Sequence, residues 1–266
     1  MPFTYLSHQA PVLAVKMRWP TAFDGTALVV GSMAPDWAYA LDGTWLAFDG
    51  HSLWGVALFC VPVAVLAAGV IRRVAPVVFA YLPSPAGVDL RQLRALAGRR
   101  PPWPMTAASA LVGALTHVGW DLFTHPGRWG ARHIAWLRSE APTILGRRVT
   151  WSTVLQYAGH VLGAAVALYL LAHILRSGAF RRWYGLDGLD PDRPPPAVAG
   201  RVRFWGISAL GAVVGFALAA VGEPGFAGRI IRVSLGLAAG LVAASVATGD
   251  TGDPAAPVGS PDGRWR

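Results

Sequence analysis

Charged residues are scarce in this chain of 266 residues. Only 14% of its positions are Asp, Glu, Lys or Arg, whereas 54% are hydrophobic, and soluble proteins carry charge at about a quarter of their positions. This shortage of charge argues against a soluble domain and predicts that much of the chain lies in lipid. The first 20 residues also lack a basic start followed by a continuous apolar run, so we expect no cleavable signal peptide.

Cysteine is nearly absent, since Cys60 is the only one. A disulfide framework within the chain is therefore excluded. Cys60 lies inside an apolar stretch, and we interpret it as a small buried hydrophobic residue. The sequence also lacks a Gly-x-Ser-x-Gly turn, so nothing in it supports a serine nucleophile.

Acidic residues are outnumbered, 14 against 23 basic ones, and the net charge of +9 is carried almost wholly by arginine. The arginines cluster between apolar stretches, where residues that anchor a protein to anionic lipid head groups are expected. We therefore expect the lipid bilayer and its anionic head groups as partners. A basic protein can also bind nucleic acid, but this distribution of arginine favours a membrane surface, and we expect no nucleic acid.

Five apolar windows have close to the ~20 residues that a bilayer requires. They are 54–71, 105–125, 152–175, 204–221 and 230–248. The stretch 26–41 is also apolar, but Gly31, Pro35 and Asp36 interrupt it, so we expect a re-entrant or interfacial helix there. The sequence thus predicts an all-α fold: a polytopic membrane helix bundle with about five transmembrane helices, which makes the chain an integral membrane protein.

The chain divides by composition into four parts. Residues 1–175 hold every candidate metal ligand and form the predicted metal-site domain, and residues 176–203 form a basic, proline-rich loop. Residues 204–248 supply two further transmembrane helices. Residues 249–266 have the composition of a disordered tail.

The most informative segment is Thr116-His117-Val118-Gly119-Trp120-Asp121-Leu122-Phe123-Thr124-His125. Residues four apart on an α-helix lie on one stripe, which groups His117, Asp121 and His125. Imidazole and carboxylate are ligands that zinc accepts, and ionisable groups at membrane depth point to function. A rise of ~1.5 Å per residue separates the two histidines by about 12 Å, so one ion cannot bind both.

Chain direction brings further ligands to the same end of this helix. His51 stands just before the first span, and Asp36 lies upstream of it. Because the second span returns antiparallel to the first, its His117 and Asp121 approach that same face, which His8 can also reach. This convergence is compatible with a mononuclear or a dinuclear metal centre.

Four short motifs resemble a known family. MPFT…SH at the start, then GSMAPD, then HS before a span, then GALTHVGWDLFTH, are similar to a bacterial integral-membrane family that is carried as a domain of unknown function. The resemblance covers about residues 1–175 and implies a bacterial cytoplasmic membrane. That family in turn distantly resembles the membrane-bound metal-dependent hydrolases and the zinc-dependent phospholipase C group.

This resemblance implies a set of metal ligands, with Asp121 bridging neighbouring ions. The set is His8, Asp36, His51, His117 and Asp121, with His125 as an approximate further ligand. A later His-x-x-x-Glu helix of those enzymes has no good match, because Gln156 stands at the corresponding spacing from His160 and glutamine binds zinc poorly. We therefore expect one or two ions of zinc or another divalent metal.

The activity implied is metal-dependent hydrolysis of a phosphoester or lipid-like substrate by a phospholipase C-like enzyme. The residues assigned to it are Asp121 and Asp36 as catalytic groups that orient water, Thr116, Thr124 and His160 as supporting contacts, and Arg128 and Arg132 as phosphate contacts. One alternative is a non-enzymatic membrane protein whose metal or polar cluster only ties helices together. A transporter is disfavoured, because the polar groups gather at one face and the last two spans are bland.

Overall fold

The computed structural model describes residues 4–249 except 86, 99, 145 and 186–195. These described residues form helices and contain no extended strand, only the isolated bridges Glu140–Thr150 and Ile144–Arg147. The all-α prediction is confirmed.

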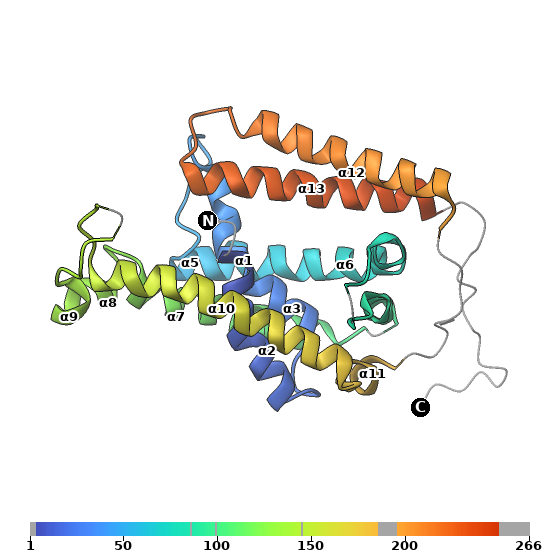
Figure 1. Ribbon diagram of the computed structural model, residues 1–266, viewed down its shortest axis with the longest axis horizontal. Coiled ribbons are helices and arrows are strands. Elements are labelled where there is room, and N and C mark those ends of the chain that lie inside the picture. The colour runs from blue at the N-terminus through green and yellow to red at the C-terminus, as the bar shows by residue number, and fades with distance from the viewer. Residues whose placement is uncertain (1–3, 86, 99, 145, 186–195, 250–266) are drawn as a thin grey trace.

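The helices follow one another along the chain as named in Figure 1. They are α1 (Thr4–Ser7), α2 (Gln9–Arg18), α3 (Gly25–Gly31), α4 (Ala34–Trp37), η1 (Ala38–Leu41), α5 (Leu53–Gly55), η2 (Val56–Cys60), α6 (Val61–Tyr81), η3 (Leu90–Ala97), α7 (Trp103–Thr124), α8 (Trp129–His133), α9 (Ala135–Arg138), α10 (Trp151–Arg176), α11 (Ala179–Tyr184), α12 (Val198–Leu218) and α13 (Phe226–Gly249).

Four helical segments are long and apolar enough to cross a membrane. They are Leu53–Tyr81, which runs continuously through α5, η2 and α6, and the single helices α10, α12 and α13. The chain is therefore a polytopic integral membrane protein. The fifth predicted window forms α7, which has a suitable length of 22 residues. It is not among the four segments that are apolar enough over 18 residues to count as spanning candidates, and it carries His117 and Asp121.

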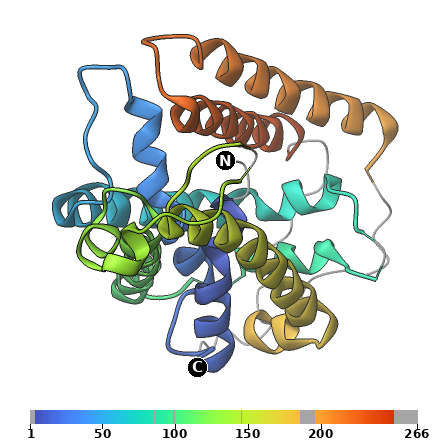
Figure 2. The same ribbon diagram turned by 60° about the vertical axis from the view of Figure 1, so that its left-hand side comes forward.

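Helix α6 lies between two groups of helices (Figures 1 and 2). The hairpin of α12 and α13 covers one side of it, and α2, α3, α7 and α10 lie on the other. The two hairpin helices touch through glycines. A Cβ atom on Gly211 of α12 would lie 2.5 Å from the carbonyl oxygen of Gly236 on α13. Small residues of this kind allow membrane helices to approach closely.

Helices α3 and α7 are in backbone contact, and this contact positions the site. A Cβ atom on Gly31 would lie 2.3 Å from the carbonyl oxygen of Ala110, and one on Gly113 would lie 2.3 Å from that of Leu28. Only glycine fits at either position. As a result, the end of α3 at Ser32 lies against the middle of α7.

Asp24 fixes the other end of α3. Its Oδ1 accepts the backbone N–H groups of Thr26 and Ala27, which caps the helix. Its Oδ2 accepts from Thr106 on α7 at 2.8 Å and pairs with Arg72 on α6. The first predicted window ended at residue 71, just before Arg72, but α6 continues to Tyr81. Pairing with Asp24 allows a guanidinium group inside this helix, because it compensates the buried charge.

Two further predictions concern connecting segments. The interrupted stretch 26–41 lies mainly in α3, α4 and η1, three short helices rather than one span. The basic loop predicted over 176–203 contains α11 and the start of α12, and its positions 186–195 lie outside the described residues. Of the predicted tail, 249–266, only Gly249 belongs to the described residues, as the last residue of α13.

Candidate metal centre

Four potential metal ligands converge where α4, α7 and the start of α5 meet. They are Asp36, His51, His117 and Asp121, and all four residues are buried. One ligand atom from each lies within 4.8 Å of all the others. A buried cluster that can hold a metal ion is therefore present, formed by residues up to 85 positions apart in the chain.

The ligand atoms lie at distances close to those between the ligands of one zinc ion. The Nε2 atoms of His51 and His117 are 3.2 Å apart. Oδ2 of Asp121 lies 3.3 Å from each of these nitrogens, and Oδ1 of Asp36 lies 3.6 Å from the first and 3.5 Å from the second. Four ligands bound to zinc at 2.0–2.1 Å would be about 3.4 Å apart. Five of the six distances between the four ligand atoms thus match those of a tetrahedral zinc site, and all of these atoms lie within 4.8 Å of one another.

Local structure holds His51 beside Asp36. A Cβ atom on Gly50 would lie 2.6 Å from the carbonyl oxygen of Pro35, so the loop that carries His51 lies directly on α4. The backbone N–H of His51 donates to Oδ1 of Asp49 at 2.9 Å. The next residue, Ser52, then caps α5 by accepting the N–H of Gly55.

The ring of His117 is oriented by α3. Its Nδ1 lies 2.7 Å from the carbonyl oxygen of Ser32. A carbonyl oxygen only accepts, so Nδ1 must carry the hydrogen and donate it. In the neutral ring this leaves the lone pair of Nε2 directed at the other three ligands, which is the tautomer that binds metal.

The charges of the cluster suit a divalent cation. Burial alone would raise the pKa of Asp36, but the nearby rings of His117 and His51 outweigh it and hold this pKa below its ordinary value. The carboxylate is therefore ionised. Two buried carboxylates need compensation by positive charge. The rings of His117 and His51 contribute to it here, whereas in a metal-bound site, where the ligating imidazoles are neutral, the ion itself would supply it. One divalent ion would balance the site.

A second set of histidines surrounds the other carboxylate oxygen of Asp121. Its Oδ1 lies 3.6 Å from Nε2 of His8 and 3.2 Å from Nδ1 of His125. The His8 ring stacks on His117 with centroids 3.7 Å apart. Burial, with the neighbouring His117, lowers the pKa of His8 to about 3, so its imidazole is neutral. Nε2 of His8 and Oδ1 of Asp121 are both buried without a hydrogen-bond partner.

Two residues of α10 complete this second set. His160 is 4% exposed, and neither of its ring nitrogens has a hydrogen-bond partner. Its ring centroid lies 6.5 Å from that of His125. The side-chain amide of Gln156 lies 2.6 Å from Nε2 of His125. Sequence reasoning dismissed Gln156 as a ligand and missed this orienting contact, although its spacing from His160 already placed both on one helix face.

The remaining predicted residues lie at different distances from the cluster. Thr124 is 3.3 Å from Nδ1 of His125, whereas Thr116 donates to Gly113 of its own helix. Arg128 is paired with Asp49 at 3.1 Å and so lies beside the His51 loop. Arg132, on α8, is exposed. Sequence reasoning did not identify Asp49 or Ser32, the residues that hold His51 and His117.

Comparison with known proteins gives a family but no activity. No curated protein and no solved structure matches this chain. The similarity to metal-dependent hydrolases and phospholipase C therefore stays a prediction. A family model, Domain of unknown function (DUF4184), matches residues 1–249, which extends past the first 175 residues to include α12 and α13. The chain belongs to the DUF4184 family.

Proposed function

We propose that this protein is a membrane-embedded metal-dependent hydrolase that acts on a phosphoester or lipid-like substrate. The observation that carries the proposal is the buried cluster of Asp36, His51, His117 and Asp121, in which five distances between ligand atoms are 3.2–3.6 Å. Two nitrogens and two carboxylate oxygens at this spacing favour zinc. A bound divalent ion supplies Lewis acidity, which polarises a phosphoryl oxygen and makes water more acidic.

The protein's own groups can move the proton of an attacking water. Oδ1 of Asp121 has no hydrogen-bond partner, so it can accept that proton while Oδ2 faces the cluster. His125 lies 3.2 Å from this oxygen, and its side chain is 27% exposed. Because Gln156 holds the opposite ring nitrogen, Nδ1 of His125 is kept facing Asp121 and can exchange a proton with its carboxylate.

The surroundings of the cluster favour an amphipathic substrate. Large apolar side chains are exposed around this end of the bundle, with Leu53 at 81%, Trp54 at 76% and Trp129 at 57%. Aromatic residues are typical of the membrane–water interface. Arg128, beside the His51 loop, offers a guanidinium group of the kind that binds phosphate. A substrate with an apolar tail and a phosphoester group fits both features.

The test is turnover of a panel of phosphoesters that includes glycerophospholipids. Detergent-purified protein is stripped with a chelator and reloaded with zinc, and Asp121→Ala is compared with His173→Ala, a matched control on α10 that lies outside the cluster. Zinc-dependent hydrolysis by the wild type and His173→Ala, lost in Asp121→Ala, is the expected result. Metal binding without turnover of any substrate would contradict the proposed activity.

That last result would favour the second candidate, a non-enzymatic protein in which the cluster ties helices together. The observation that supports this second candidate is the burial of the ligands, since His117 is 1% exposed and His51 is 7% exposed. A structural ion needs no opening to solvent, whereas a catalytic one keeps a position for water. Unfolding on chelation, with no hydrolysis, would identify this second role.

A further inference from the structure

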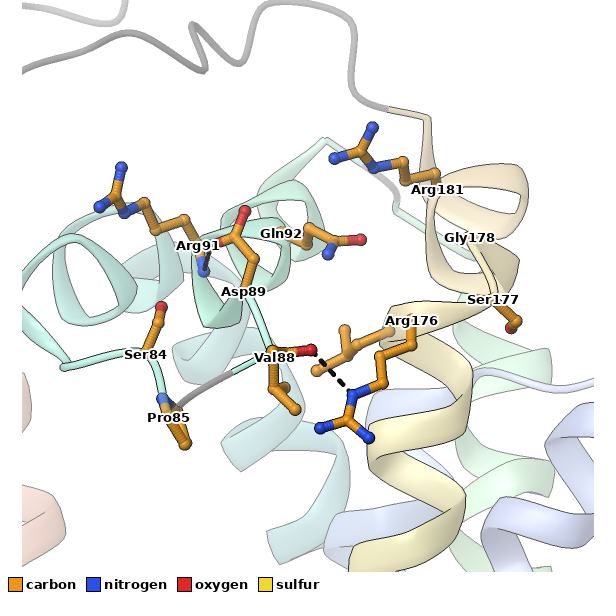
Figure 3. Close-up of a pocket in the computed structure, with 12 residues that line it drawn as sticks. Ser84, Pro85, Val88, Asp89, Arg91, Gln92, Arg176, Ser177, Gly178 and Arg181 are labelled. Atoms are coloured by element: carbon orange, nitrogen blue, oxygen red, sulfur yellow. Dashed lines mark hydrogen bonds between the residues drawn. The ribbon is translucent and has the colours of Figure 1, made fainter.

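A cavity of about 820 Å³ lies at the opposite end of the bundle from the metal centre. The connection from α6 to η3 and the start of η3 form one wall (Figure 3). The end of α10 and the start of α11 form the other. The metal cluster lies at the start of the Leu53–Tyr81 segment, whereas this cavity lies just beyond its end, so the two sites are separate (Figure 1).

The lining of the cavity is basic. Arg91, Arg176 and Arg181 contribute three guanidinium groups, against the single carboxylate of Asp89. Oδ1 of Asp89 accepts the backbone N–H of Arg91 at 3.0 Å. Within the part of the chain that the structure describes, neither Arg91 nor Arg181 has a salt-bridge partner. An excess of guanidinium groups around one cavity is suited to an anion, above all to phosphate.

One of these arginines is already held in place. Nε of Arg176 donates to the carbonyl oxygen of Gly87 at 2.8 Å, the contact dashed in Figure 3. Gly87 has a φ of +73°, and a Cβ atom there would lie 3.2 Å from a guanidinium nitrogen of Arg176. The left-handed turn therefore needs glycine for its backbone and leaves room for the arginine. This contact fixes the guanidinium group at the cavity wall.

Gln92 provides a second and independent indication of a ligand, one that donates a hydrogen bond. It is 7% exposed, it lines the cavity, and its Oε1 is buried without a hydrogen-bond partner. Its amide extends from η3 toward α11 (Figure 3). A buried carbonyl oxygen without a donor costs free energy. A ligand that brings a hydroxyl group would remove this cost.

The cavity lies at the level where lipid head groups are expected. It follows the last residue of the first spanning segment, Tyr81, and includes the last residue of α10, Arg176. Helix α12 begins at this same end, since Phe204 stacks on Tyr81 with centroids 4.4 Å apart. Three membrane-spanning candidates thus have an end here, where basic residues meet anionic head groups.

We propose that this cavity binds the phosphate group of a ligand that also carries a hydroxyl group. The arginines bind the phosphate, and Gln92 accepts from the hydroxyl group. The position at the helix ends favours the head group of an anionic phospholipid with a glycerol moiety as the source of this phosphate. A free phosphate ester has the same chemistry and is the second source. The proposal is independent of the metal centre.

The test measures binding to the detergent-solubilised full chain by native mass spectrometry and competition. The probes are short-chain phosphatidylglycerol, phosphatidylcholine and inorganic phosphate. The variant is Arg91→Gln/Arg181→Gln, and the matched control is Arg201→Gln/Arg203→Gln, which removes two exposed arginines from the same end of the bundle. Thermal melting checks that both variants fold.

We expect saturable binding of phosphatidylglycerol that is at least about tenfold weaker in the cavity variant, since the loss of even one of its two charge-assisted contacts implies that change, and unchanged in the control. Displacement by inorganic phosphate at similar concentration supports the site and assigns it to a free phosphate. Equal weakening in the control overturns the proposal, because general surface charge then explains the binding. Binding of phosphatidylcholine as tight as phosphatidylglycerol, or of no probe, also overturns it.

Gln92→Met tests the second requirement at nearly constant volume. It should weaken binding of phosphatidylglycerol but leave unchanged the binding of phosphatidic acid, which has no head-group hydroxyl beyond its phosphate. Equal effects on the two lipids would contradict the role of Gln92. Metal content is measured on the same samples, so failure here is distinguishable from failure of the proposed hydrolase.

Discussion

His117 donates its Nδ1 hydrogen to the carbonyl oxygen of Ser32 across 2.7 Å, and this contact decides which nitrogen faces Asp36, His51 and Asp121. The donor and acceptor belong to different helices, so the tautomer of the ring depends on how closely α3 packs on α7. That packing rests on Gly31 and Gly113, which have no room for a side chain. Helix packing and ligand geometry are therefore linked.

Gly113→Val should weaken metal binding without changing any ligand. Its Cβ would lie 2.3 Å from the carbonyl oxygen of Leu28, so α3 and α7 must separate and Ser32 must move from His117. Loss of such an orienting contact lowers metal affinity about 10–100-fold, which chelator competition measures. Gly119→Ala is the control, because a Cβ there meets nothing within 4 Å. Equal affinities in both variants would refute this linkage.

Asp24→Asn should destabilise the bundle through Arg72. The substitution leaves a guanidinium group uncompensated inside α6, and breaking a buried ion pair in this way costs about 3–5 kcal/mol. Chemical unfolding in detergent measures the change. The double variant Asp24→Asn/Arg72→Leu should recover part of the loss, because the unpaired charge is then removed. A loss below ~1 kcal/mol in the single variant would show that the pair contributes little.

Arg128→Gln should weaken substrate binding while metal content stays constant. Arg128 lies beside the metal centre through its pair with Asp49, and its guanidinium group is the proposed contact to a phosphoester. We expect KM to rise about tenfold, as removal of one charge-assisted contact implies. Arg148→Gln, in the same connection and 85% exposed, is the control. A fall in metal content with unchanged KM would assign Arg128 a purely structural role.

The membrane fold and the ligand set could be predicted from the sequence for different reasons. Apolar windows identify the spanning helices directly, because a bilayer imposes length and composition on each segment. Antiparallel chain direction was enough to predict that Asp36 and His51 approach His117 and Asp121. The helix rise separates His125 from His117 by about two turns, with Asp121 between them. This explains why His117 contacts Oδ2 of Asp121 and His125 contacts Oδ1.

Residues whose role depends on how distant segments pack together were not predictable in this way. Ser32 contributes a carbonyl oxygen, which every residue has, and its role arises only from the packing of α3 on α7. Gln156 meets His125 across two helices that are separated by the connection 125–150. The contact of Gly50 with α4 likewise depends on a loop path that no local pattern encodes.

Elemental analysis of the detergent-purified protein tests the central claim most directly. The wild type and His173→Ala should each retain about one zinc ion per chain at the cluster of Asp36, His51, His117 and Asp121, or two if the His8, His125 and His160 side of Asp121 also binds an ion. His117→Ala and Asp121→Ala should lose the ion while remaining folded in the detergent micelle. A wild type that retains no stoichiometric metal after reloading with zinc would contradict the account.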